Sequence, residues 1–450
     1  MKPSTSERSL HYRWIIFGVL GLGYIIVYFH RLCPAILALD MMRDLNAGGA
    51  LIGFLGSAYF YPYAVMQLPA GLLSDSWGAR KTVSLFLLIA CAGSLLLGLA
   101  PSTAIAIIGR TLVGLGVSML FVPAMKVFSE WFDADEYATV SGLFIAVGGF
   151  GSLISATPLA WMSSWIGWRM SFVFIGAVTF VLSVLTWLIV SDRPQDRDAV
   201  HSAVTYPGPP KQVITLREGV AVVLSYPRFW AMASWIFFNT TVFFALGGLW
   251  GGPYLMHVYN LDKTQSGNIL AMLAFGMILG SPVLAYLSTH LFKARKPVLL
   301  LSSFALILIT LSMTVFTAGI PLTMLFVLFF GIGVFAGAVV SVGFTATKEM
   351  FPVQIAGTAI GLVNLFPFAA SAVFQPFIGY ILERSGRTGD AFTVAGYRNA
   401  MLVFCACCAI AFLSTLFVKD ARVGSGTADQ ETGRNSELET HGNAELRVRR

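Results

Sequence analysis

The sequence predicts an all-α membrane protein with twelve transmembrane helices in two pseudo-symmetric six-helix bundles. Composition is the first observation: of 450 residues, 56% are hydrophobic and only 11% are charged, whereas soluble domains carry roughly 25% charged residues. Length is the second, because twelve spans of ~20 apolar residues fill about 240 positions and leave room for connections. The third is a similarity between the two halves of the chain. Together they argue against a soluble enzyme, a nucleic-acid-binding protein and a disordered scaffold.

Apolar segments long enough to cross a bilayer recur along nearly the whole chain. We place the spans at residues 13–38, 50–73, 82–100, 103–131, 138–162, 168–190, 228–257, 265–290, 297–317, 320–349, 356–382 and 396–418. A polar stretch with several prolines, 191–227, indicates a linker. It separates an N-terminal bundle (1–190) from a C-terminal bundle (228–418). The tail (419–450) has almost no large apolar residues, so we expect it to be disordered.

The distribution of Lys and Arg indicates the orientation. Most of those outside the spans fall in the two tails, in the linker and in the loops after the second and eighth spans. We therefore expect a multi-pass protein of the cell inner membrane with both termini, the linker and the tail in the cytoplasm. The same asymmetry accounts for the net charge of +7 without a nucleic acid as partner.

No pattern for metal, nucleotide or covalent chemistry stands out, so we expect neither a cofactor nor a metal, and not an enzyme. The cysteines all lie in apolar runs and none has CxxC spacing. They are Cys33, Cys91, Cys405, Cys407 and Cys408.

The two halves of the chain share short motifs at a constant offset. Glu130-Trp131-Phe132 ends the fourth span, and Glu349-Met350-Phe351 ends the tenth, 219 positions later. Gly142 matches Gly361 at the same offset. Duplicated six-helix halves are a transporter architecture with the substrate site near the midplane.

Residues 71–81 follow the pattern G-x-L-x-D-x-x-G-x-R-[KR], which resembles the loop signature of the major facilitator superfamily. Three further segments are similar to motifs of that family: 110–116, with Arg-x-x-x-Gly-x-Gly; 148–158, rich in glycine and ending in proline; and 167–172, beginning Gly-Trp-Arg. The second copy of the loop signature, 280–296, has no aspartate. The resemblance implies the twelve-helix fold of this superfamily and transport by alternating access.

Within the loop signature, Asp75 and Arg80 are candidates for gating. An aspartate near a helix end can pair with basic groups of a neighbouring helix, and Glu130 at the end of the fourth span is the expected partner of Arg80. Such pairs would hold the cytoplasmic side in one conformation and release it in the other.

The first span carries tyrosines and an embedded Arg31, similar to the sugar-phosphate permease-like and anion:cation symporter branches. The latter often has an acidic residue before the arginine, but here His30 occupies that place. The former has a second arginine in the seventh span, but residues 237–250 contain no basic residue. These departures argue against a phosphate ester and leave a singly charged organic anion, such as a carboxylate or an amino acid.

Arg31 is the main candidate for substrate binding. It lies about 27 Å along a helix from Arg13, in the outer half of the first span. A charge at membrane depth usually lines a cavity or has a partner, and a guanidinium can bind an anionic group through two hydrogen bonds. The alternatives are an arginine that reaches the outer surface, or one that pairs with Asp40 or Asp44.

Three other ionisable residues near or within spans have two interpretations each. His30 could titrate during transport or be a packed side chain. Arg110 could hold or modulate a proton-binding group, or bond a carbonyl. Lys126 could pair with Glu130, four residues on in the helix, or contact the substrate from the inside.

The remaining candidates are uncharged polar side chains that either contact the substrate or bond between helices. They are Tyr28, Tyr59, Tyr63, Asn239, Asn364 and Gln375. Tyr59 and Tyr63 share one face of a helix.

The function expected from these features is secondary active transport of a small organic anion (a carboxylate, an amino acid or a related metabolite) across the inner membrane by alternating access. No Asp or Glu lies deep in a span, so we expect coupling through His30, through the ionisation of the substrate (symport with protons) or through solute exchange. The partners expected are the substrate, a coupling ion and the bilayer, and the chain is expected to be a monomer. The alternatives are an exporter of drugs or lipophilic compounds and a non-transporting membrane sensor.

Overall fold

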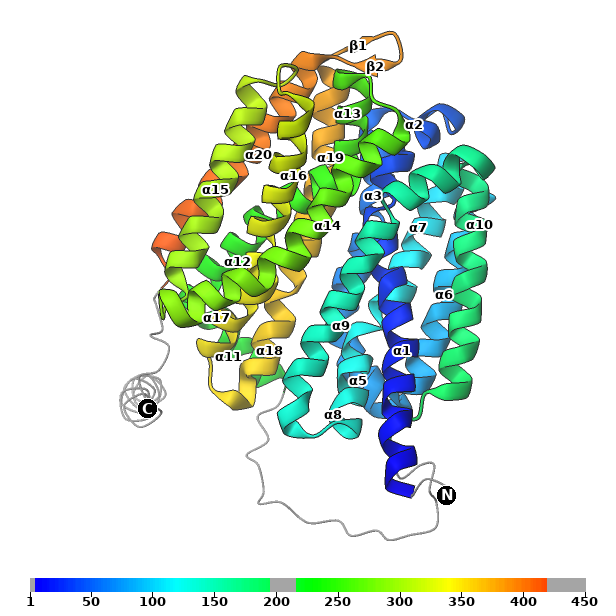
Figure 1. Cartoon of the computed structure of the whole chain (residues 1–450), viewed down its shortest axis with the longest axis vertical. Coiled ribbons are helices and arrows are strands. Elements are labelled where there is room, and N and C mark those ends of the chain that lie inside the picture. Colours follow the sequence, from blue (N-terminus) through cyan, green and yellow to red (C-terminus); the bar gives the residue numbers. More distant parts are fainter. Residues whose placement is uncertain (1–4, 195–215, 419–450) are drawn as a thin grey trace, which may run out of the picture.

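The structure is a computed structural model that describes residues 5–194 and 216–418. Within these ranges the chain is almost entirely helical (Figure 1). The tail predicted to be disordered (419–450) and residues 195–215 of the predicted linker lie outside the described residues. The rest of that linker includes an unexpected helix, α11 (Leu216–Ser225), which packs against α18 (Val353–Val363).

The first bundle consists of ten helical segments. They are α1 (Thr5–Leu32), α2 (Pro34–Asp44), α3 (Gly49–Ser57), α4 (Phe60–Val65), α5 (Gln67–Trp77), α6 (Ala79–Gly98), α7 (Thr103–Ser118), α8 (Phe121–Trp131), α9 (Ala134–Ile154) and α10 (Thr157–Ile189).

The second bundle contains the remaining helices, three π-helical stretches and a short antiparallel hairpin. The elements are α12 (Pro227–Thr241), η2 (Val242–Trp250), α13 (Gly251–Tyr259), α14 (Lys263–Tyr286), η3 (Leu287–Leu291), α15 (Lys296–Val315), α16 (Leu322–Ala336), η4 (Val339–Gly343), α17 (Phe344–Glu349), α18, α19 (Leu365–Arg384), β1 (Arg387–Thr388), β2 (Ala391–Phe392) and α20 (Val394–Leu416).

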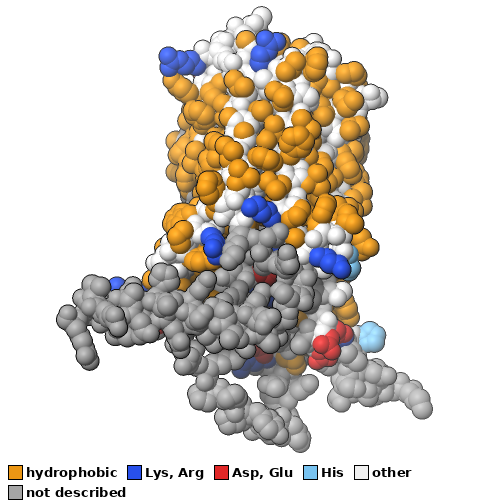
Figure 2. All heavy atoms as spheres, turned by 90° about the vertical axis from the view of Figure 1, so that its left-hand side faces the viewer, with side chains coloured by type: hydrophobic (Ala, Val, Ile, Leu, Met, Phe, Trp, Pro, Cys, Tyr) orange, Lys and Arg blue, Asp and Glu red, His pale blue; other side chains and the backbone are white. Residues whose placement is uncertain are grey.

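The prediction of twelve spans is confirmed. In the described part of the chain, 11 helices are long and apolar enough to cross a membrane, and a bent pair supplies the twelfth. That pair, Gly49–Val65 and Pro69–Trp77, bends by 59°, where the sequence predicted one continuous span. Large apolar side chains cover the outer surface between the Lys and Arg residues near both ends (Figure 2), which is the surface that lipid requires.

Prolines account for several breaks within and between the helices. A proline has no N–H and its ring clashes with the carbonyl four residues earlier, so a helix is interrupted there. Breaks precede Pro34, Pro62, Pro69, Pro123 and Pro158. The first break separates α1 from α2 and frees the carbonyl of His30, which becomes important in the site below.

The two bundles pack closely at the hairpin end, which we define as the end with β1 and β2, Asp40 and Lys263. The opposite end, where α1 begins and α20 ends, we call the terminal end (Figure 1). Glycines of α3 permit contact with α19: a Cβ on Gly53 would lie 2.5 Å from the carbonyl oxygen of Gln375. Small residues allow helix backbones to approach in this way.

Polar contacts also join the bundles at the hairpin end, and two of them involve carboxylates. The Lys263 ammonium pairs with the Asp40 carboxylate. The backbone N–H of Gly49, in the first turn of α3, donates to the Glu383 carboxylate at 2.7 Å, so an otherwise unpaired N–H of a helix start is satisfied by the other bundle.

Candidate functional site

Arg31 lies near the end of α1, between the two bundles. Its side chain is buried, with the residue 4% exposed, and Nη2 donates to the Tyr63 hydroxyl at 2.7 Å. The guanidinium carbon lies 4.6 Å from the ring centre of Tyr28, 4.8 Å from that of Tyr63 and 5.1 Å from that of Phe368. Tyr28 and Tyr63 come from the first bundle and Phe368 from α19 of the second. We call these three residues the aromatic cage; their ring faces stabilise the cation.

No carboxylate in the described residues neutralises Arg31. Asp40 pairs with Lys263 and, at 3.7 Å, with Arg43. Asp44 accepts the indole N–H of Trp168 at 2.9 Å, and this hydrogen bond holds the pKa of the Asp44 carboxyl below its usual range. Neither aspartate therefore pairs with Arg31, the alternative that the sequence allowed. Among the described residues, the Arg31 Nε has no hydrogen-bond partner.

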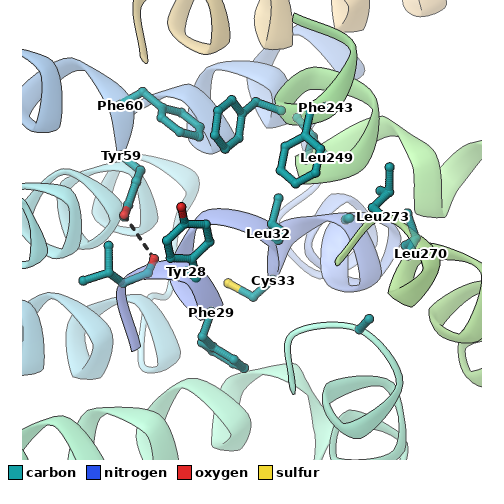
Figure 3. Packing of buried hydrophobic residues seen from close by; sticks show 14 of the residues in the cluster. Tyr28, Phe29, Leu32, Cys33, Tyr59, Phe60, Phe243, Leu249, Leu270 and Leu273 are labelled. Carbon is teal, nitrogen blue, oxygen red and sulfur yellow. Dashed lines mark hydrogen bonds between the residues drawn. The ribbon is translucent and has the colours of Figure 1, made fainter. Parts of the chain in front are cut away.

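The tyrosines on α3–α5 form one wall beside Arg31. The rings of Tyr59 and Tyr63 are stacked with centres 5.6 Å apart. The Tyr59 hydroxyl donates to the Val27 carbonyl of α1 at 3.3 Å (Figure 3), whereas the Tyr63 hydroxyl faces Arg31. Figure 3 also shows Phe60 of the first bundle and Phe243 and Leu249 of the second on one side of the segment that carries Tyr28 and Cys33.

Arg110 on α7 bonds the carbonyl that the break before Pro34 leaves free. Its Nη1 donates to the His30 carbonyl oxygen at 3.0 Å, which is one of the two roles predicted for Arg110. In the part of the chain that the structure describes, the Arg110 Nε and Nη2 have no hydrogen-bond partner, and neither do the two ring nitrogens of His30. The His30 ring lies parallel to Phe172 of α10. It therefore faces the interior of the first bundle, whereas Arg31 faces the aromatic cage.

Two of the three predicted amides lie where the bundles meet. Asn364 donates to the Gln67 side chain across the interface at 2.9 Å. Gln375 donates through Nε2 to the Phe244 carbonyl of η2 at 3.0 Å, and its buried Oε1 accepts no hydrogen bond from the described residues. Asn239 donates instead to Ser302 of α15 at 3.2 Å, within the second bundle.

Phe368 and the π-helix η2 are parts of the site that the sequence analysis missed. Phe368 lies one helical turn after Asn364. The helical spacing that places Asn364 and Gln375 on one face also includes Phe368 and could have indicated it. The π-helix left no such signal. A Cβ on Gly248 in η2 would lie 3.4 Å from both the Arg31 carbonyl oxygen and the Gln375 Nε2, so this glycine admits the backbone of α1.

The predicted ion pair between Arg80 and Glu130 is wrong for this conformation. Arg80 donates through Nε to the Trp187 carbonyl at 2.6 Å, because its position on α6 directs it to α10. Glu130 lies 3.9 Å from Arg193 instead.

Lys126 forms a different ion pair from the one expected within its helix. Its ammonium lies 2.6 Å from the Asp75 carboxylate and also donates to the Ser74 carbonyl at 3.0 Å. The pair between Lys126 and Glu130 is thus replaced by a contact between α8 and the end of α5. Asp75 does meet a basic group of a neighbouring helix, as its motif predicts.

A family profile described as Major Facilitator Superfamily matches residues 20–251 and again residues 236–448. The chain belongs to the major facilitator superfamily. The repeated match also agrees with the duplication that the motifs indicated. The protein is therefore a membrane transporter by family and fold, and not an enzyme.

Several curated transporters are similar over most of their length. The probable sulfoacetate transporter SauU of Cupriavidus necator is 26% identical, with 87% of this chain and 92% of that protein covered. The probable galactarate/D-glucarate transporter GudP of Bacillus subtilis is 26% identical (88% and 90% covered). The hexuronate transporter of Escherichia coli K12 is 25% identical (83% and 88%).

Solved structures confirm the fold. A bacterial homolog of the human lysosomal transporter Spinster, in an inward-facing and unoccupied conformation, superposes with a TM-score of 0.71 at 18% identity, covering 90% of this chain and 98% of that one. A D-xylose-proton symporter gives a TM-score of 0.68 at 15% identity, covering 90% and 97%.

Proposed function

We propose that this superfamily member is a secondary transporter of a small organic anion, and that Arg31 is the main contact for the anionic group. The observation that carries the proposal is a buried guanidinium between the bundles with no carboxylate partner in the described residues. A charge placed so deep costs at least a few kcal/mol, and an anionic substrate would offset that cost. Relatives named for hexuronate, galactarate or D-glucarate, and sulfoacetate support the same class of cargo.

The groups around Arg31 suit a hydroxylated carboxylate. The Tyr63 hydroxyl and the free Nε of Arg31 would bind the carboxylate, while the aromatic cage excludes water and strengthens the attraction. The unpaired Oε1 of Gln375 would accept a hydrogen bond from a substrate hydroxyl. The same buried cation disfavours the alternative of an exporter of lipophilic cations.

We further propose that transport proceeds by alternating access with both termini cytoplasmic. In this conformation the cargo would exchange with the cytoplasm at the terminal end, because contacts between the bundles close the hairpin end. Coupling would use protons carried by His30 or by the substrate, or exchange of solutes. The protein would work as a monomer in the inner membrane.

Uptake into proteoliposomes tests the proposal. Hexuronate, D-glucarate and sulfoacetate would be offered separately to wild type, Arg31→Ala and Arg384→Ala. Arg384 is a matched control because it bonds only an exposed tyrosine hydroxyl on its own helix in the described residues. Hydrogen bonds to a charged group contribute ~1.5–3 kcal/mol. Their loss in Arg31→Ala predicts a fall in the rate of uptake of about 10- to 150-fold.

Equal transport by Arg31→Ala and wild type would remove Arg31 from the binding site. If the protein transports none of the three anions but does transport a lipophilic cation, the result would support the alternative function of an exporter. Ligand binding without flux of any solute would support the sensor.

A further inference from the structure

A groove of about 430 Å³ opens on the outer surface of the first bundle between α6 and α10, which lie side by side (Figure 1). Its walls are apolar: Leu85 and Leu88 of α6 face Phe180 and Val184 of α10. All four side chains are exposed, between 39% and 51%. In a membrane protein this surface faces lipid, so the groove is open to the bilayer.

The polar atoms within the groove already have partners. The Ser84 hydroxyl donates to the Arg80 carbonyl at 2.7 Å, and the Ser183 hydroxyl donates to the Ser84 carbonyl at 2.7 Å. The second bond also ties α10 to α6. These two hydroxyls are therefore not free to donate a hydrogen bond to a polar ligand, and the interior of the groove suits a hydrocarbon chain.

The groove ends in a positively charged mouth toward the terminal end. Trp77 and Trp187 flank it, half-exposed, and tryptophan is typical of the level of lipid headgroups. Lys81 lies at this mouth, and its ammonium group forms no hydrogen bond or ion pair with any described residue.

Arg80 adds a second cation beside Lys81. Its guanidinium carbon lies 4.8 Å from the Trp187 ring centre, and Nε donates to the Trp187 carbonyl. The nearby carboxylates are engaged elsewhere: Asp192 accepts the backbone N–H of Arg80 at 2.7 Å, and Asp75 pairs with Lys126. Neither carboxylate pairs with the Arg80 guanidinium in the described part of the chain.

We propose that this groove binds an anionic glycerophospholipid, with one acyl chain between α6 and α10 and its phosphate at Lys81 and Arg80. Charge complementarity identifies the occupant: a narrow apolar slot that opens to the bilayer leads to two cations at headgroup level, and anionic headgroups attract such cations. The proposal is independent of the transported substrate.

The bound lipid would stabilise the joint between α5 and α6. Gly78 forms this joint with φ +86°, and a Cβ there would lie 2.2 Å from the Asp192 carboxylate. The same joint carries Asp75, whose contact with Lys126 holds α5 to α8. A lipid at Lys81 would therefore bind beside the segment that carries the family signature.

The test compares two lipids on the purified, delipidated full-length protein. Phosphatidylglycerol and phosphatidylcholine with the same acyl chains would be titrated in detergent, with binding followed by native mass spectrometry and by thermal unfolding. Wild type is expected to bind phosphatidylglycerol at least threefold more tightly. Lys81→Gln should abolish that preference, whereas Lys293→Gln, the same change in the corresponding loop of the second bundle, should keep it.

A substitution that fills the groove tests whether the acyl chain binds between α6 and α10. Val184→Trp should weaken binding of both lipids, whereas Leu188→Trp, on the same helix but outside the groove, should not. Equal binding of the two lipids by wild type, or wild-type preference in Lys81→Gln, would overturn the proposal. Unchanged lipid binding by a folded Val184→Trp would also overturn it, as would a dimer whose interface covers the groove between α6 and α10. If Val184→Trp does not fold, the comparison of Lys81→Gln with Lys293→Gln tests the proposal by itself.

Discussion

At Arg31, one side chain combines three features that rarely occur together: burial, a full positive charge and no carboxylate partner in the described residues. Its guanidinium donates a hydrogen bond to the Tyr63 hydroxyl, and the aromatic cage compensates for part of the lost hydration. Most of the stabilisation is therefore left for a ligand to supply. This is why we expect substitutions here to change transport more than folding.

Removing the Tyr63 hydroxyl should weaken substrate binding. Tyr63→Phe keeps the ring of the cage but leaves the guanidinium without its hydroxyl partner, so we expect KM to rise about tenfold. Concentration-dependent uptake in proteoliposomes measures this. Tyr380→Phe is the control, because it also removes a tyrosine hydroxyl that bonds an arginine, at 2.6 Å from Arg384 but away from the site. Equal KM values for the two variants would contradict a role of Tyr63 in binding.

At the scale of a helix, the break between α1 and α2 shows how a local sequence signal acquires a tertiary role. Pro34 cannot donate to the His30 carbonyl, and Arg110 from α7 donates in its place. A proline in one helix and an arginine about eighty residues later in the chain thus act as a unit, in which the arginine supplies the hydrogen bond that the proline removes.

A double-mutant cycle tests this unit. Pro34→Ala restores the N–H within the helix, so the change Arg110→Met should be less destabilising in that background by about 1 kcal/mol. Thermal unfolding of wild type, both single variants and the double variant gives the coupling energy. In a Pro62→Ala background, where no arginine bonds the freed carbonyl, the effect of Arg110→Met should equal that in wild type. Additive effects of Pro34→Ala and Arg110→Met would contradict the unit.

The contact between α3 and α19 depends on glycine. Gly53→Trp places a large side chain where a single Cβ would already be 2.5 Å from the Gln375 carbonyl oxygen, so the hairpin end should open. The reaction of maleimide with Ile52→Cys, a buried position on α3, should become at least tenfold faster. Gly18→Trp is the control, because a Cβ there meets nothing within 4 Å. Unchanged labelling in Gly53→Trp would show that this contact does not close the hairpin end.

At the scale of the whole molecule, closure of the hairpin end combines this glycine contact with two carboxylates that reach between bundles, Asp40 and Glu383. Both are at the end of the molecule remote from the termini, and neither contacts Arg31. The arrangement separates the group proposed to bind substrate from the groups that hold the bundles together.

Neutralising both carboxylates should separate the bundles at this end. With spin labels at Ser164→Cys and Arg398→Cys, one in each bundle, the pair Asp40→Asn and Glu383→Gln should shift the distance distribution toward longer values. Asp44→Asn is the matched control, because the carboxylate of Asp44 pairs with Arg43 and accepts a hydrogen bond from Trp168, both of the first bundle. A distribution identical to that of wild type would mean that packing alone closes this end.

Apolar runs and short motifs in the sequence were enough to predict twelve spans, a relation between the halves, the family and the polar residues worth examining, because spans depend on local apolar composition and motifs on local spacing. The sequence also located Arg31 within a span. Only the tertiary structure decided that Phe368 completes the cage, that Arg110 takes the His30 carbonyl, and that Lys126 pairs with Asp75 while Arg80 turns to α10. These contacts join helices far apart in the chain, and their geometry follows from how proline breaks and glycine contacts orient each helix against its neighbours.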